Sequence, residues 1–304
     1  MSIDQVTLKQ LRVLEATARH RSVTRAAESL FVTPPAVSTQ LKKLEKKVGA
    51  TLLHRTSDGF ELTPAGTQVV DLAASIRALM DRTGDRLRAL REGASGYAVL
   101  GVVSTGKYFA PGIVARFQRL HPGIRVALAV GNRAEILRGI DRREYDLLIM
   151  GRPPAHLPFQ LDVLGDHPFV LIARPDHPLA EESDIAHATL RDQVFLTREE
   201  GSGTRLLTSR FLDHISDERT LQVMEMGTNE TIKQAVLAGL GIALISRHTC
   251  HVELAEGRLV SLDVEGLPLV RQWYLIAPED RELTRAAESL QGFILAHRGD
   301  LLPD

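Results

Sequence analysis

The sequence has little cysteine and no long apolar run. One cysteine, Cys250, among 304 residues excludes an internal disulfide and a metal site built from several cysteines, and it suits a reducing compartment. No apolar stretch approaches the roughly 18 residues that a membrane-spanning helix needs. The opening MSIDQVTLKQ lacks the basic and then apolar pattern of an export signal. We therefore expect a cytoplasmic protein with no membrane contact.

The signatures of common catalytic sites are also missing. Ser202 lies in E-G-S-G and not in the G-x-S-x-G of a nucleophile elbow. The 11 histidines include no H-x-x-x-H pair within a helix, and Gly239-Leu240-Gly241 reads as a helix-to-strand turn. We expect no catalytic residue, no bound metal and no resident cofactor, so the protein is predicted not to be an enzyme. A solute-binding protein, or an enzyme built on the second half of the chain, stays as a remote alternative.

The length suits two or three domains, and charge is distributed unevenly between them. Residues 1–93 carry 15 Lys and Arg against 10 Asp and Glu, whereas residues 94–304 carry 22 against 28. A basic segment joined to an acidic body indicates local contact with a polyanion.

The stretch 34–48 has the pattern of an amphipathic helix with a cationic front. At about 100° per residue, Val37, Leu41, Leu44 and Val48 share one stripe, and the side chains that fall opposite are Pro35, Thr39, Lys42, Lys43 and Lys46. Thr33 is predicted as the N-cap, with its hydroxyl accepting from a backbone N–H. Proline is favoured in a first turn, because no intrahelical donor is lost there. Pro34 and Pro35 therefore start this helix, and Gly49 fits just after its end.

The flanking residues complete a winged helix-turn-helix pattern. Shorter helices are predicted at 7–19 and 25–30, and a short link leads into the lysine-rich helix, which would enter a major groove. After Gly49 two strands are expected around Asp58-Gly59, a hairpin turn signal. That hairpin would form a wing, with Arg55 near a phosphate. The alternative is a solvated lysine face on an ordinary helical bundle, and it does not account for the caps and the hairpin.

Residues 64–93 are expected to form one long helix after an N-cap at Thr63. Val69, Leu72, Ile76, Leu79, Thr83, Arg86 and Leu90 recur at spacings of three and four, as in a coiled-coil seam that weakens toward its end. A second copy of the chain is the simplest partner for this stripe, and packing on the protein's own body is the alternative.

From residue 97 onward strands and helices alternate, which predicts an α/β body with largely parallel sheets. Expected helices are 108–120, 133–142, 203–214, 229–238 and 284–297. Three segments combine hydroxyls with a following helix start, namely 102–109, 197–205 and 226–236. Free amides at helix N-termini bind anions, and Lys107, Arg152, Arg198 and Arg205 can add charge. We expect a small anionic ligand there, with ordinary helix capping as the alternative.

The stretch SVTRAAESLFVTPPAVSTQLKKLEKKVGATLLHR, followed by LTPAG, resembles the N-terminal signature of LysR-type transcriptional regulators. Pro34 stands where the family usually has a glutamine that contacts DNA, so a polar contact is expected to be missing or replaced by an apolar one with a thymine methyl. The resemblance and the helical pattern together nominate the following DNA-binding residues: Ser22, Thr24, Thr33, Pro34, Pro35, Ser38, Thr39, Lys42, Lys43, Lys46 and Arg55.

The body is similar to the LysR-type effector domain, which has two periplasmic-binding-protein-like lobes around a cleft. VSTGKYFAP, GNR, DLLIMGRPP, REEGSGTR and GTNETIKQAVLAGLGIALIS resemble the CbbR-like subgroup, which regulates Calvin-cycle carbon-fixation operons. The implied effector is a phosphorylated metabolite, such as a sugar phosphate, or NADPH. The nominated effector-binding residues are Ser104, Thr105, Lys107, Asn132, Arg152, Gly201, Ser202, Gly203, Thr204, Arg205, Asn229 and Thr231.

The resemblance also implies an organisation and a set of partners. We expect a winged helix-turn-helix domain at 1–63, a linker and dimerisation helix at 64–93, and an effector-binding domain at 97–304. Its first lobe would comprise about 97–166 with 269–304, and its second lobe about 167–268. The expected partners are promoter DNA with an inverted repeat, further copies of the chain in a dimer or tetramer, and RNA polymerase. The alternative is a LysR-type regulator of another metabolic operon with a different inducer.

Overall fold

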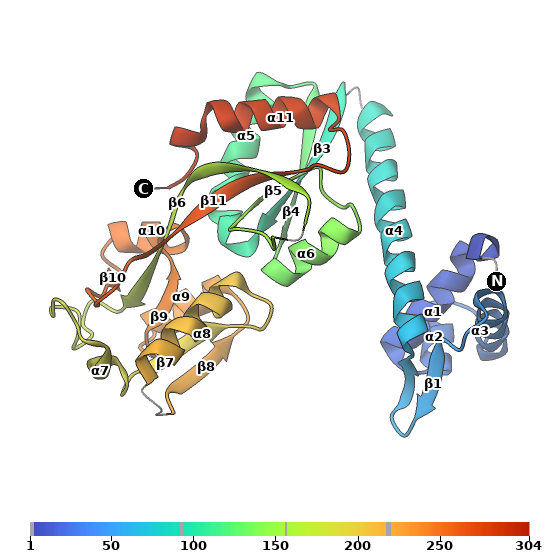
Figure 1. The fold of residues 1–304 in the computed structure, drawn as a ribbon, viewed down its shortest axis with the longest axis horizontal. Coiled ribbons are helices and arrows are strands. Elements are labelled where there is room, and N and C mark those ends of the chain that lie inside the picture. The colour runs from blue at the N-terminus through green and yellow to red at the C-terminus, as the bar shows by residue number, and fades with distance from the viewer. Residues whose placement is uncertain (1–2, 92–93, 156, 217–219, 304) are drawn as a thin grey trace. The chain divides into compact units, whose positions relative to one another are not determined.

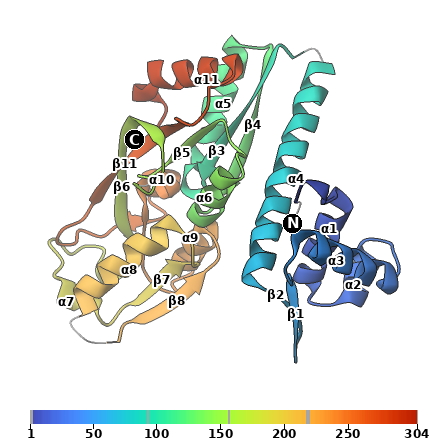
Figure 2. The same cartoon turned by 45° about the vertical axis from the view of Figure 1, so that its right-hand side comes forward.

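The computed structural model describes residues 3–91, 94–155, 157–216 and 220–303. The chain divides into two compact units, residues 1–84 and 85–304, whose ribbons are drawn from two directions in Figures 1 and 2. Within the described residues, none of the helices combines the length and the apolar character that crossing a bilayer requires.

The first unit is a small helical domain with a two-stranded hairpin. Its elements are η1 (Ile3–Gln5), α1 (Leu8–His20), α2 (Val23–Ser29), α3 (Pro34–Val48), β1 (Leu53–Thr56), β2 (Gly59–Leu62) and most of α4 (Pro64–Arg91). The predicted stripe of α3 is buried through Val37, Leu41 and Leu44, which pack with Leu14 of α1 in one core. The helix-turn-helix and the wing predicted from the sequence are confirmed.

The start of α3 differs from the prediction in one detail. Thr33 occupies the N-cap position in extended conformation, but its hydroxyl accepts no capping hydrogen bond. The predicted bond from a backbone N–H is therefore wrong. Two of the first helical residues are prolines, which have no N–H, so fewer donors need a cap. Gly49 ends the helix in left-handed conformation, as expected.

The wing is held against the rest of this unit by its glycine. The Phe60 backbone N–H donates to the Arg21 carbonyl over 3.0 Å, and the Arg21 side chain pairs with Glu61. Gly59 has φ +121°, and a Cβ at this position would lie 2.1 Å from the Arg21 oxygen. Only glycine permits both this backbone conformation and this close approach.

Helix α4 contributes its beginning to the first core. The Thr63 hydroxyl accepts from the Gly66 N–H over 3.0 Å, which confirms the predicted cap. Val69 and Ala73 are buried against α1 and α3, so the predicted seam residue Val69 serves the domain's own core. The large apolar side chains that stay exposed along the helix are Leu72, Leu79, Met80, Leu87 and Leu90.

The second unit alternates strands and helices. In chain order its elements are β3 (Gly96–Val103), η2 (Ser104–Tyr108), α5 (Ala110–Leu120), β4 (Ile124–Gly131), α6 (Arg133–Asp141), β5 (Leu147–Met150), β6 (Phe159–Ala173), α7 (His187–Leu190), β7 (Val194–Arg198), α8 (Gly203–Ser216), β8 (Gln222–Met226), α9 (Asn229–Leu237), β9 (Ala243–Ser246), α10 (Arg247–Ala255), β10 (Val260–Ser261), β11 (Leu269–Pro278), α11 (Arg285–Ala296) and η3 (Arg298–Asp300). All five helices predicted in this unit are confirmed, and α7 and α10 lie where none was predicted.

The expectation of largely parallel sheets is wrong. Seven of the described strands form one sheet in the order β10-β6-β11-β5-β3-β4, with β9 also paired to β6. Only the pairs of β3 with β4 and β5 are parallel there. The long strands β6 and β11 run antiparallel to each other, and β11 is paired along its whole length with β6 between Phe159 and Phe169. A separate two-stranded sheet pairs β7 with β8 in parallel.

Alternation along the strands produces separate cores, as a two-residue period requires. In β3, Leu100 and Val102 face α5 and α11, whereas Val99 faces α6. The second pair of cores lies around β9, α8 and α9. Strand β6 passes from the first pair to the second between Leu164 and Phe169. The two lobes thus share β6 and β11, which Figure 1 shows running between them; the limits of lobes and domains stay a prediction.

Candidate DNA-binding and effector sites

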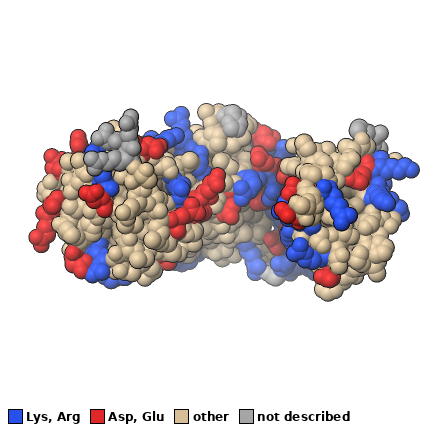
Figure 3. All heavy atoms as spheres, turned by 90° about the horizontal axis from the view of Figure 1, so that it is seen from below, with Lys and Arg blue, Asp and Glu red and all other residues tan. Residues whose placement is uncertain are grey.

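The front of α3 presents the predicted cationic and small polar side chains. Thr33, Pro34, Pro35, Thr39, Lys42, Lys43 and Lys46 are exposed, and Ser38 is half-buried. Lys42, Lys43 and Lys46 form no ion pair with any residue that the structure describes. In the space-filling view of Figure 3, Lys and Arg spheres gather on this unit, at the right of the picture.

The flanks of α3 add further donors. Ser22 caps α2 by accepting from the Arg25 N–H over 3.4 Å, and Thr24 and Arg25 are exposed in the first turn of that helix. Arg55 is exposed on β1 of the wing. Lys47, by contrast, is held inside the unit, because its ammonium donates to the Gln5 carbonyl and to Gln10. Of the four lysines of α3, Lys47 therefore has a structural role.

A cavity of about 630 Å³ opens between the two lobes of the second unit. The nominated effector residues that line it are Ser104, Thr105, Arg152, Ser202, Gly203 and Thr204. The strand end at Ser104 and the N-terminus of α8 at Gly203 thus face the same space. Free amides and hydroxyls at these two places are suited to bind an anion.

Three more arginines line this cavity, and none of them was nominated from the sequence, although Arg133 stands in the GNR motif. They are Arg133 on α6, Arg210 on α8 and Arg271 on β11, which join Arg152. None of the four forms an ion pair with a residue that the structure describes, and Asp166 is the one carboxylate among the described residues of the cavity wall. Burial lowers the pKa of Arg133, but an arginine starts so high that it stays charged. The cavity is strongly cationic.

A second cavity of about 700 Å³ lies between α5, α10 and the last residues of the chain. It is slightly larger, but only Arg116, Arg247 and His251 bring basic groups to it, and Asp300 opposes them. The Arg116 guanidinium already donates to the Asp300 carbonyl over 3.2 Å. The space between the lobes is therefore the better anion site on charge and on helix geometry.

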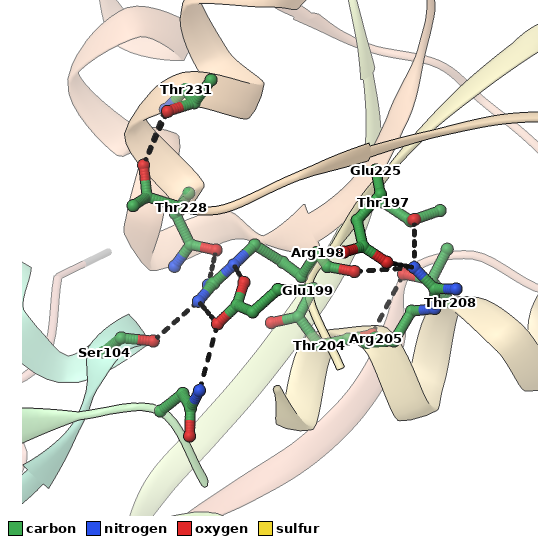
Figure 4. A network of polar contacts seen from close by, with 12 residues as sticks. Ser104, Thr197, Arg198, Glu199, Thr204, Arg205, Thr208, Glu225, Thr228 and Thr231 are labelled. Atoms are coloured by element: carbon green, nitrogen blue, oxygen red, sulfur yellow. Dashed lines mark hydrogen bonds and ion pairs between the residues drawn. The ribbon is translucent and has the colours of Figure 1, made fainter. Parts of the chain in front are cut away.

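Arg205 does not reach the cavity. Its guanidinium donates to the Thr197 hydroxyl and to the Arg198 carbonyl, each over 2.8 Å, and pairs with Glu225 over 3.0 Å. Figure 4 shows this cluster behind the N-terminus of α8. The reason is helical geometry: the positions of α8 that line the cavity are 203, 204, 206, 207 and 210. Positions 203, 206, 207 and 210 are spaced as one helix face, and position 205 lies off that face.

Three of the other nominated residues take part in a network of contacts between the two lobes beside the cavity. Asn132 caps α6 and donates to Glu199 over 3.3 Å, and the Ala134 N–H donates to the Gly201 carbonyl over 3.0 Å. Asn229 accepts from the buried Arg198, which also donates to the Ser104 hydroxyl over 3.3 Å (Figure 4). The remaining two do not line the cavity either: Thr231 bonds Thr228 at the start of α9, and Lys107 lies over the Tyr108 ring.

Behind the cavity the shared strands carry a stack of aromatic rings. His167 of β6 lies parallel to Trp273 of β11 with 3.9 Å between ring centroids, and the indole N–H donates to Nδ1 of His248 over 3.0 Å. Burial lowers the pKa of His167 well below its ordinary value, and the proximity of His248 adds to this. Burial also lowers the pKa of His248, to about 4. Both rings are neutral at pH 7.

Comparison with known proteins identifies the family. Residues 8–67 match the model of the bacterial regulatory helix-turn-helix protein, lysR family, and residues 91–299 match the LysR substrate binding domain. The chain belongs to the LysR family. The family resemblance seen in the sequence is thereby confirmed, together with the winged helix-turn-helix and the two-lobed effector domain.

Relatives of this LysR-family chain carry names from one branch of the family. The HTH-type transcriptional regulator CbbR of Cereibacter sphaeroides is 44% identical and covers 99% of this chain and 98% of its own. The RuBisCO operon transcriptional regulator of Allochromatium vinosum is 42% identical and covers 96% of both chains. Among solved structures, the Synechocystis PCC6803 CcmR regulatory domain in complex with 2-PG is 34% identical, with a TM-score of 0.63 over 68% of this chain and 99% of that one. The relatives are named as regulators, which agrees with the prediction that this LysR-family protein is not an enzyme.

Proposed function

We propose that this LysR-family protein regulates carbon-fixation genes by binding promoter DNA in response to a phosphorylated metabolite. The observation that carries the proposal is the cleft with Arg133, Arg152, Arg210 and Arg271 around the N-terminus of α8, in a chain 44% identical to a CbbR. One guanidinium can donate two parallel hydrogen bonds to the oxygens of a phosphate, so several arginines around one space favour a phosphate group over an uncharged ligand.

The DNA contact follows from the exposed front of α3 and the wing. Lys42, Lys43, Lys46 and Arg55 would neutralise phosphates, and the side chains at the start of α3 would face base edges. The exposed apolar stripe of α4 favours pairing with a second copy, which would present two recognition helices to an inverted repeat. We further propose that the chain assembles into a tetramer and that it acts on RNA polymerase. Work on a chromosomal promoter requires the protein to be in the cytoplasm.

Salt dependence of DNA binding tests the docking of α3. Lys42→Ala is expected to weaken binding of the full chain to an inverted repeat upstream of the neighbouring operon. The slope of log K against log salt should fall by about 0.9 for each phosphate that the variant no longer neutralises. Lys47→Ala is the matched control on the same helix, because its ammonium already serves Gln5 and Gln10. Equal slopes in Lys42→Ala, Lys47→Ala and the unaltered protein would reject the docking.

Calorimetric titration of the full chain with 2-PG, ribulose bisphosphate and NADPH tests the cleft. Arg271→Ala is expected to weaken binding of the phosphorylated ligand by about 10- to 100-fold, as for the loss of one charged hydrogen bond. Arg258→Ala, which removes the same charge but pairs with Glu256 at the surface, should bind as the unaltered protein does. An equal loss in both variants would show that net charge alone, and not the cleft, attracts the ligand.

A further inference from the structure

The turn between α2 and α3 contains a conformation that its residue does not favour. Helix α2 ends in a pair of backbone bonds, from the Val32 N–H to the Ala27 carbonyl over 3.0 Å and from the Phe31 N–H to the Glu28 carbonyl over 3.1 Å. This is the Schellman arrangement, whose left-handed position is usually glycine. Here the left-handed residue is Phe31, with φ +55°.

No burial inside the protein offsets the conformational cost at Phe31. The residue is 96% exposed, more than any other large apolar residue that the structure describes. A left-handed conformation is costly for a residue with a bulky side chain, and an exposed ring buries no area to offset that cost. A strained backbone conformation that no contact within the protein stabilises points to an interaction with another molecule.

The surroundings of Phe31 point to the partner. It precedes the start of α3, and apart from Thr33 the exposed positions that follow it are Val32, Pro34, Pro35 and Ala36, none of which carries a side-chain donor or acceptor. Glu28 and Ser29, the exposed positions before it, belong to the end of α2. Lys42 and Lys46 further along the same helix attract phosphates. The front of this unit is thus cationic along α3 and largely apolar at its beginning.

We propose that Phe31 is a DNA-contacting residue, and that its ring packs against the C5-methyl group of a thymine at the edge of the major groove. That methyl is the one apolar group that base edges present there. The inference rests on the proposed function, because it needs α3 to dock on DNA. It adds base preference through apolar contact, at the end of α3 where Pro34 and Pro35 leave no side-chain hydrogen bond.

The test compares three variants of the full chain on the same operator fragment. Phe31→Asn removes the ring and introduces a residue that tolerates the left-handed conformation. This variant should bind DNA about 10-fold more weakly, with an unchanged slope of log K against log salt. Phe31→Leu keeps an apolar side chain and should lose less. Ile3→Ala is the control, because Ile3 is also apolar and exposed but lies in η1, near the other end of α3 where Lys47 bonds Gln5.

Stability and base analogues separate DNA contact from turn geometry. Phe31→Asn should raise the melting temperature of the first unit while it lowers DNA affinity. Replacing the contacted thymine by uracil, which lacks the methyl, should weaken binding of the unaltered protein and not weaken Phe31→Asn further. Equal DNA affinity of Phe31→Asn and the unaltered protein would overturn the inference, and so would equal losses on uracil in both. If the unaltered protein binds no operator fragment at all, the proposed function itself fails.

Discussion

The buried ion pair of the second lobe allows a stability prediction with a direction and a size. The Lys233 ammonium of α9 lies 2.7 Å from the Glu253 carboxylate of α10, with side chains 5% and 9% exposed. Replacing Lys233 by methionine removes the cation and leaves Glu253 charged in a dry environment. Breaking a buried pair from one side costs about 3–5 kcal/mol, a large part of the roughly 5–15 kcal/mol that stabilises a domain.

The two partners are not equivalent, and this sharpens the prediction. In Glu253→Gln, Lys233 still has Glu230 at 3.2 Å and the Tyr108 ring at 4.9 Å. We therefore expect Glu253→Gln to cost less than Lys233→Met. The double variant Lys233→Met, Glu253→Gln should cost less than the sum of the two, because no unpaired charge is left.

Urea unfolding followed by Trp273 fluorescence is the suitable assay. Trp273 is the one tryptophan in the chain and is fully buried in the second unit, so its signal reports on that unit alone. Urea is uncharged and does not screen the pair, unlike guanidinium. With m of about 2–3 kcal/mol/M, Lys233→Met should lower the midpoint by about 1–2 M. Additive effects of the two substitutions, or a larger loss in Glu253→Gln, would refute the reasoning.

Three further predictions concern single residues. Gly59→Ala should destabilise the first unit by more than about 1 kcal/mol, because the new Cβ meets the Arg21 carbonyl. The urea midpoint of the far-UV circular dichroism transition that reports on the first unit should fall, while the midpoint of the Trp273 fluorescence transition stays the same. An unchanged midpoint for the first unit would contradict this. The folded pKa of His248, about 4, lies below the unfolded value. The stability that is present above about pH 6.5 should therefore be lost as the pH falls toward 4. In His248→Gln the urea midpoint should depend less on pH over this range. Burial raises the pKa of the Cys250 thiol to about 12, so DTNB should react with it only after unfolding, and rapid reaction of the native protein would show that the thiol is accessible.

Local signals explain why the first unit could be predicted from the sequence. The Thr33-Pro34-Pro35 start, the stripe of Val37, Leu41 and Leu44, and Gly49 act within a few residues of one another, so the helix could be placed without tertiary information. The wing followed from Asp58-Gly59 for the same reason. What local signals did not reveal was the contact between Gly59 and Arg21, residues far apart in the sequence.

The effector site shows where sequence reasoning ended. Segments with hydroxyls and helix starts were found, and Ser104, Ser202 and Thr204 do line the cleft. Arg205 was nominated from its motif, whereas Arg210 lies on the cleft face of α8 about two helical turns after Gly203. Counting by helix face along α8 could have found Arg210. No such count could have found Arg271, because β11 reaches the cleft only through its antiparallel pairing with β6.

The sequence by itself determined most of the helices, which helix carries a cationic front, and which family the chain resembles, because these depend on caps, turns and periodicity within short stretches. Only the tertiary structure decided that β6 and β11 pair antiparallel and that four arginines, from α6, α8, β11 and the loop after β5, surround one cavity. It also decided that Arg198 and Asn132 serve as contacts between the lobes. Strand pairing and charge convergence depend on contacts between residues far apart in the chain, and no local pattern encodes them.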